Sequence, residues 1–216
     1  YDEDPVLHDI MNDLRFRKAF SLAINREDIN KALFFGEAVP RQPLALPSVS
    51  FLEEKWENYY AEYDPERAEK LLADMGLKEK NSDGFLLRSD GKPLTIVFEY
   101  VEENSTQTKL MELVQKNAAE LGINLVLKMQ PIDLYKQRRA ANLIHANGTS
   151  GVKTTEYRVA MGDGYPITAE NLINWGTEWG AWFGNHENGE EPSQVVKDLR
   201  NAREKMQKSV VYKSDE

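Results

Sequence analysis

Residues 94–129 read LTIVFEYVEENSTQTKLMELVQKNAAELGINLVLKM. The first seven residues are rich in β-branched and aromatic side chains, which favours a central strand at 94–101. Residues 105–121 then place apolar side chains at helical spacing until Gly122 ends the pattern, and the apolar run at 123–129 predicts a second strand. Strand, helix and strand form a βαβ unit, so we expect the two strands to run parallel with a right-handed crossover.

A tight hairpin is predicted directly before the first of these strands. Ser89-Asp90-Gly91-Lys92 separates residues 84–88 from residues 94–101, and the Asp-Gly pair supplies the positive φ that a hairpin turn requires. Such a hairpin adds antiparallel pairing to the parallel unit. We therefore expect an α/β fold with a mixed sheet flanked by helices.

Further helices are predicted on both sides of the βαβ unit, several of them marked by start and stop signals. Asn25 and Asp64-Pro65 suit helix starts, while Gly36 and Gly76 suit helix ends. The predicted helices cover residues 13–24, 25–36, 64–76, 131–141, 168–182 and 192–207. Three prolines make residues 37–51 an extended connection, and one more strand is expected near 157–161.

Composition excludes several classes of function. The 216 residues include 27 Lys and Arg against 36 Asp and Glu, a net charge of −9, so the surface repels phosphate backbones and we expect no nucleic-acid partner. The absence of cysteine excludes disulfides, thiolate metal sites and a cysteine nucleophile. No phosphate-cradling glycine motif is present. We expect no cofactor and no bound metal.

Histidine-based chemistry has little support in the sequence. His8, His145 and His186 are far apart in sequence, none forms an i, i+4 pair, and no serine sits in a nucleophile-elbow pattern. Paired carboxylates for glycoside hydrolysis could be drawn from the many acidic residues, so a carbohydrate-active enzyme stays open as an alternative.

An aromatic cluster is the most unusual feature. Tyr165, Trp175, Trp179, Trp182 and Phe183 fall within a short glycine-rich stretch, and the three tryptophans are spaced i, i+4, i+7 along one helical face. This face either packs in the core or lines a cleft. In a cleft, the rings would offer flat apolar surfaces and an indole donor to sugar rings or peptide side chains.

Several passages, in the same order, resemble one protein family. Residues 13–29 read DLRFRKAFSLAINREDI, residues 36–40 read GEAVP, and residues 63–72 read YDPERAEKLL. These resemble the "VRqAlsyAiDRe" helix pair, the "GyAvP" exit and the "YdPekAkkLL" helix of bacterial extracellular solute-binding proteins of family 5, the peptide/nickel-type substrate-binding proteins of ABC transporters. The resemblance covers roughly residues 10–135.

The resemblance implies a fold and a function. Residues 1–216 would form the carboxy-terminal lobe of a two-lobed protein, a single lobe of the type II periplasmic-binding fold, with the other lobe absent. The whole protein would be an extracytoplasmic, non-enzymatic and monomeric component of an ABC importer, which closes on an oligopeptide or oligosaccharide and then docks on permease subunits. Residues 189–192, which read GEEP, resemble a subgroup that takes large ligands. A peptide receptor without transport is a further alternative.

The resemblance also implies where the ligand binds. Gly162-Asp163-Gly164-Tyr165-Pro166 is similar to the family's "aDYPDP" loop, although Ile167-Thr168 replaces its second Asp-Pro. Asp163 would then meet a peptide ammonium group, and a solvated loop carboxylate is the other interpretation. Together with the aromatic cluster, this gives the predicted ligand-binding set: Asp163, Tyr165, Trp175, Trp179 and Trp182.

Overall fold

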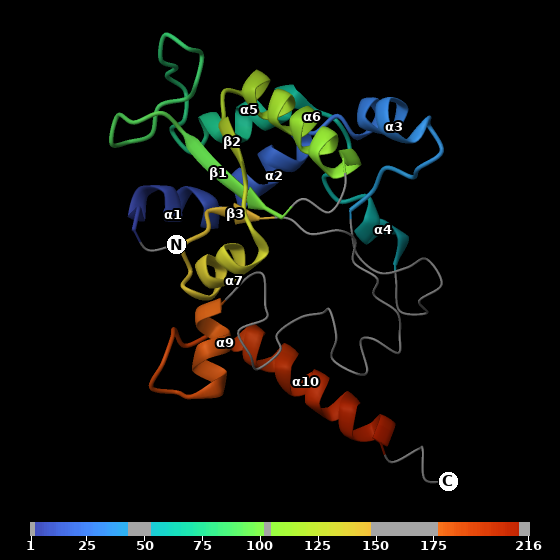
Figure 1. Cartoon of the computed structure of the whole chain (residues 1–216), viewed down its shortest axis with the longest axis vertical. Coiled ribbons are helices and arrows are strands. Elements are labelled where there is room, and N and C mark those ends of the chain that lie inside the picture. The colour runs from blue at the N-terminus through green and yellow to red at the C-terminus, as the bar shows by residue number, and fades with distance from the viewer. Residues whose placement is uncertain (1–2, 43–52, 102–104, 148–176, 212–216) are drawn as a thin grey trace. The chain divides into compact units, whose positions relative to one another are not determined.

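The computed structural model describes residues 3–42, 53–101, 105–147 and 177–211 (Figure 1). The chain divides into two compact units. The first contains residues 1–42, 54–138 and 143–150, and the second contains residues 43–53, 139–142 and 151–216. Each unit is described by itself below.

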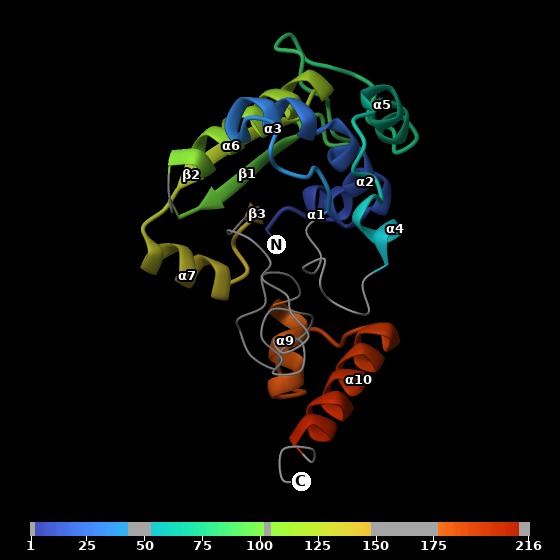
Figure 2. The ribbon, with the colours of Figure 1, turned by 90° about the vertical axis from the view of Figure 1, so that its right-hand side faces the viewer.

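A three-stranded parallel sheet lies in the first unit. β1 (Thr95–Tyr100) occupies its centre, between β2 (Asn124–Met129) and β3 (Ala146–Asn147). β1 pairs with β2 from Thr95↔Asn124 to Tyr100↔Met129, and α6 (Ser105–Leu121) connects them along the sheet (Figure 2). The predicted βαβ unit and the central position of β1 are confirmed. The short strand β3 was not predicted.

The expected mixed sheet is wrong, because the sheet in the described residues is parallel. The turn before β1 forms as predicted, with Gly91 at φ +79° and the Arg88 amide donating to the Lys92 carbonyl at 2.9 Å. Its antiparallel pairing, however, consists of single bridges such as Leu87↔Pro93. The ladder does not extend into β1, because the Leu86 amide donates to the Gly122 carbonyl instead of to Leu94.

Helices cover the rest of the first unit. They are α1 (Pro5–Asn12), α2 (Leu14–Ala23), α3 (Arg26–Phe34), α4 (Glu54–Glu57), α5 (Pro65–Ala73), α6 and α7 (Ile132–Ala140), whose last two residues belong to the second unit. Asp13, Asn25 and Asp64 cap α2, α3 and α5 by accepting hydrogen bonds from first-turn amides. These helices match the predictions. α1 and α4 were not predicted.

One apolar core joins the sheet to α1, α2, α3, α5 and α6. Its fully buried members include Leu7, Leu22, Leu72, Leu94 and Ile123. The apolar side chains of α2 divide between the core and the surface. Phe16, Ala19 and Leu22 are buried, whereas Leu14 is 56% exposed at the first position of the helix.

The described part of the second unit contains two longer helices, α9 (Thr177–Gly184) and α10 (Gln194–Val211). Buried Val196 on α10 contacts Trp179 and Phe183 of α9. The expected helices at 168–182 and 192–207 are found here as far as the described residues reach, and the strand expected near 157–161 lies outside them. In the part of the chain described, every helix is too short or too polar to cross a membrane.

Candidate functional site

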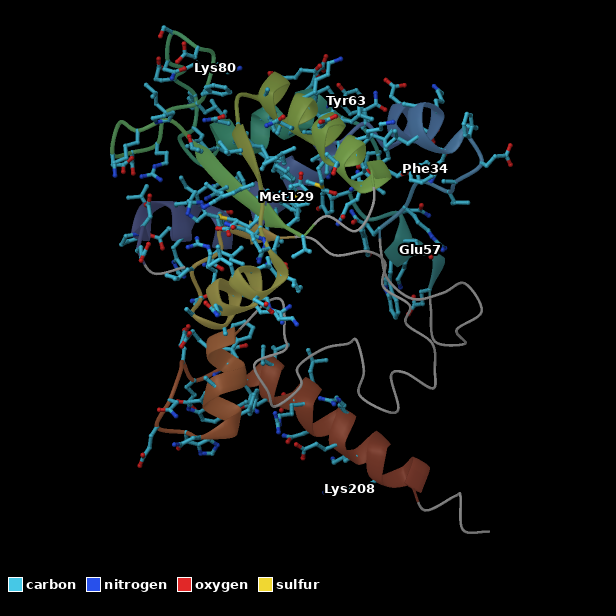
Figure 3. The ribbon with its side chains drawn as sticks, viewed as in Figure 1. Phe34, Glu57, Tyr63, Lys80, Met129 and Lys208 are labelled. Carbon is cyan, nitrogen blue, oxygen red and sulfur yellow. The ribbon has the colours of Figure 1, made fainter. Side chains whose placement is uncertain are left out.

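The parallel strands end at one edge of the sheet, and ligands of open α/β sheets bind outside this carboxyl edge. Met129 marks the end of β2 there (Figure 3), and Tyr100 and Asn147 end β1 and β3. Asp163, Tyr165 and Trp175 follow β3 in the sequence and lie outside the described residues. This edge is the candidate site.

A buried carboxylate organises the edge. Glu99 on β1 is 1% exposed and accepts hydrogen bonds from Arg138 of α7 and from Gln130, which follows β2. Arg138 Nε lies 2.8 Å from Glu99 Oε2, and Arg138 Nη2 lies 2.7 Å from Glu99 Oε1. This two-pronged pairing is the strongest geometry available to an arginine and a carboxylate.

The charge on Glu99 is retained despite its burial. Burial raises the pKa of Glu99, but the hydrogen bonds from Arg138 and Gln130 and the positive charge of Arg138 outweigh that effect, so the pKa lies below its usual value. The carboxylate and the guanidinium are therefore both charged at neutral pH. They tie α7 to the end of β1.

Two further contacts hold β3. His145 Nδ1 accepts a hydrogen bond from the Val97 amide at 3.3 Å, which requires an imidazole that is unprotonated at Nδ1. Burial lowers the pKa of His145, in agreement with that neutral form. The Tyr135 hydroxyl donates to Asn147 Oδ1 at 3.2 Å. In the described residues, the polar groups of the edge thus pair with one another.

The predicted ligand-binding residues divide into two groups. Asp163, Tyr165 and Trp175 lie outside the described residues. Trp179 and Trp182 are on α9, so the predicted helical placement of these two is confirmed. Whether any of the five contacts ligand stays a prediction.

Both tryptophans of α9 already have packing partners. Trp179 packs against Val196. Trp182 stacks on His186 with ring centroids 4.1 Å apart and meets Phe183 edge-on at 5.3 Å, while Lys197 Nζ lies 5.0 Å from its ring centroid. Both tryptophans are half-buried, and Trp182 also carries the His186 ring and the Lys197 cation on its surface.

Other possible sites are weaker. Among the described residues, no group of three or more His, Asp or Glu side chains could hold a metal. A hollow of about 280 Å³ between α5 and the end of α6 has the leucine side chains of Leu72, Leu77, Leu86 and Leu121 in its lining. A second hollow, of about 360 Å³, lies beside Arg26 and Tyr63. Neither hollow includes Glu99 or a predicted ligand-binding residue.

The Glu99–Arg138 pair was not predicted from the sequence. One feature of the sequence pointed to Glu99. It is the charged residue in the apolar strand TIVFEY, and a carboxylate in a central strand needs a partner. Arg138 lies 39 positions further along the chain, beside Arg139. Nothing in the sequence distinguishes these two arginines.

A family match covers most of the chain. Residues 4–178 match the family described as "Bacterial extracellular solute-binding proteins, family 5 Middle". The chain belongs to family 5. As a family 5 chain, it is part of a family of solute-binding proteins that bind their ligands and do not convert them, so the alternative of a carbohydrate-active enzyme is not supported.

Family 5 relatives include proteins named for different ligands. The periplasmic alpha-galactoside-binding protein of Rhizobium meliloti (strain 1021) is 30% identical over 152 residues, 65% of this chain and 22% of that protein. The oligopeptide-binding protein AppA of Bacillus subtilis (strain 168) is 23% identical over 95% of this chain and 36% of its own length.

A solved structure supports the same relationship. The oligopeptide-binding protein OppA superposes with a TM-score of 0.84 at 30% identity, covering 94% of this chain and 34% of that chain. The parallel sheet with its flanking helices thus matches part of an OppA-like structure. The chain spans about a third or less of the length of these relatives.

Proposed function

We propose that this chain is part of the substrate-binding component of an ABC importer, which captures an oligopeptide or an oligosaccharide outside the cytoplasm. The match to family 5 over residues 4–178 carries the proposal. The carboxyl edge of the sheet is consistent with it, because open α/β sheets bind ligands outside this edge and its described polar groups are held by mutual hydrogen bonds. The protein would act as a monomer, without a metal or a cofactor, and would deliver ligand to permease subunits.

Residues 1–216 would form the carboxy-terminal lobe of a type II periplasmic-binding fold. In such a protein two lobes close on the ligand, and closure creates the surface that the permease recognises. The coverage of about a third of OppA agrees with a chain that supplies one wall of the cleft. The ligand-contacting residues of this wall would be Asp163, Tyr165, Trp175, Trp179 and Trp182.

The relatives support two classes of ligand. A peptide would place its ammonium group on Asp163 and its side chains among the aromatic rings, whereas an oligosaccharide would stack its rings on the tryptophans. The two classes predict different effects of one substitution. Asp163→Asn removes the charge that a peptide amino terminus needs and leaves the stacking surfaces intact.

The experiment uses the full-length protein with each class of ligand. Pools of oligopeptides and of α-galactosides are compared by thermal shift and then by titration calorimetry. A ligand at 100 times its Kd stabilises the folded protein by about 2.7 kcal/mol, which is readily measured as a rise in Tm. Peptide capture predicts binding that is lost in Asp163→Asn and with amino-acetylated peptides; sugar capture predicts that Asp163→Asn still binds. Binding of neither pool would refute the proposal.

A further inference from the structure

Arg138 connects two segments that meet at the carboxyl edge. Its Nε and Nη2 atoms hold Glu99 at the end of β1, and Nη2 also donates to the Leu143 carbonyl at 3.1 Å. Leu143 precedes β3 by three residues. The same guanidinium therefore fixes the centre of the sheet and the chain that enters β3.

β3 needs such support because it is very short. Its two residues pair with β1 as Phe98↔Ala146 and Glu99↔Asn147. Two residue pairs fix the position of β3 beside β1, but they constrain the direction of so short a strand poorly, because each hydrogen bond contributes only a modest free energy. Besides these pairs, two hydrogen bonds hold β3 in place, one between His145 and Val97 and one between Tyr135 and Asn147.

Glu99 gives the anchor its strength. The carboxylate is buried, and it accepts from Gln130 Nε2 at 2.8 Å as well as from Arg138. Removing one partner of a buried ion pair leaves an uncompensated charge, so the arrangement tolerates little displacement of α7 from the end of β1. The ends of β1 and β2 and the entry to β3 all meet around this one carboxylate.

We infer that Arg138 is a positioning residue for ligand binding: through Glu99 and the Leu143 carbonyl, it holds the end of β1 and the entry to β3 in place at the carboxyl edge of the sheet. It acts on affinity without touching the ligand. This inference rests on the proposed function, because that function places the ligand at this edge. Neither the residue type of Arg138 nor its position in the sequence indicates this role in affinity.

The first unit offers a matched control. Arg88 makes the same kind of contact at the hairpin before β1, with Nε and Nη2 on Asp90 and Nη1 on Asp4 at 2.7 Å. Its side chain is 3% exposed, so Arg88→Met also breaks a two-pronged ion pair, one in which the guanidinium is buried and the Asp90 carboxylate is 26% exposed. Arg88 lies ahead of the amino end of β1, however, and has no contact with β3 in the described hydrogen bonds.

The test measures Tm and Kd for the full-length protein and its variants, with the ligand found in the screen above. Arg138→Met should weaken binding tenfold or more, while Arg88→Met lowers Tm comparably and leaves Kd within twofold. Arg138→Lys keeps a positive charge near Glu99 but cannot reach both carboxylate oxygens and the Leu143 carbonyl. It should therefore recover most of the lost Tm and still bind several-fold more weakly than wild type.

Backbone hydrogen exchange supplies a readout that does not depend on ligand. Arg138→Met should speed exchange at residues 143–147 more than in the rest of the sheet, and Arg88→Met should not. Equal losses of affinity in Arg138→Met and Arg88→Met, or wild-type affinity in Arg138→Met, would overturn the inference while the proposed function stands. Failure of the wild-type protein to bind either ligand pool would refute both.

Discussion

Gly189 is predicted to be irreplaceable in the loop between α9 and α10. Its φ is +73°, and a Cβ at this position would lie 2.1 Å from the Glu178 carbonyl oxygen and 2.9 Å from Trp182 N. The left-handed conformation costs a non-glycine residue about 1–2 kcal/mol. Relieving the overlap also breaks the hydrogen bond that the Glu190 amide donates to the Glu178 carbonyl, which is worth about 1 kcal/mol. We expect Gly189→Ala to destabilise the α9–α10 pair by roughly 2–3 kcal/mol.

Hydrogen exchange is the suitable assay, because separate units of a protein open with separate free energies. The control is Gly76→Ala at the end of α5, where φ is +87° and no atom lies within 4 Å of the added Cβ. That variant carries only the conformational cost of about 1–2 kcal/mol. If Gly189→Ala lowers the opening free energy of α9 by no more than Gly76→Ala lowers that of α5, the reasoning from close approach is wrong.

Three other predictions follow from the first unit and from the proposed cleft. Leu94→Ala removes a fully buried side chain and should lower the free energy of unfolding in urea by about 2–5 kcal/mol, whereas exposed Leu14→Ala should change it by less than about 0.5 kcal/mol. Hydrogen bonds from Arg88 lower the pKa of Asp4 and bring the pKa of Asp90 to about 2. The stability that these two carboxylates contribute is therefore complete above the usual carboxyl pKa near 4 and is lost as the pH falls toward 2. Tm measured from pH 7 to pH 2 should show this loss, and the loss should be smaller in Arg88→Met. The 216-residue chain alone should bind oligopeptides and oligosaccharides weakly or undetectably in calorimetry, since one wall supplies only part of the binding energy, and tight binding would contradict this.

The elements that were predicted correctly have local causes. The βαβ unit follows from the apolar run at 94–101, the helical spacing at 105–121 and Gly122, all of which act over a few residues. The missed helix α1 carries the same Asp-Pro start as α5, with Asp4 as its cap, so its signal was available in the sequence. β3 could not be predicted in this way, because a two-residue strand has no periodicity of its own.

The site was less predictable than the fold, because it depends on contacts between distant residues. Glu99 and Arg138 form their ion pair only when α7 packs beside the end of β1. The antiparallel pairing of the hairpin ends where the Leu86 amide donates to the distant Gly122 carbonyl, an outcome that local turn chemistry at Asp90-Gly91 does not reveal. For the tryptophans, spacing placed Trp179 and Trp182 on a helix but did not indicate that Val196 and His186 are their neighbours.

The central position of β1 has a consequence for synthesis on the ribosome. Both strands that pair with β1 are translated after it, so a nascent chain exposes the run Thr95–Tyr100 with two open edges until residues 124–129 and then 146–147 emerge. Apolar, β-prone runs with open edges readily seed aggregation, and a charge within them opposes it. Glu99 is the charged residue of this run, and Arg138 is made later. During translation the carboxylate would therefore keep β1 soluble, before it becomes the buried anchor of the finished sheet.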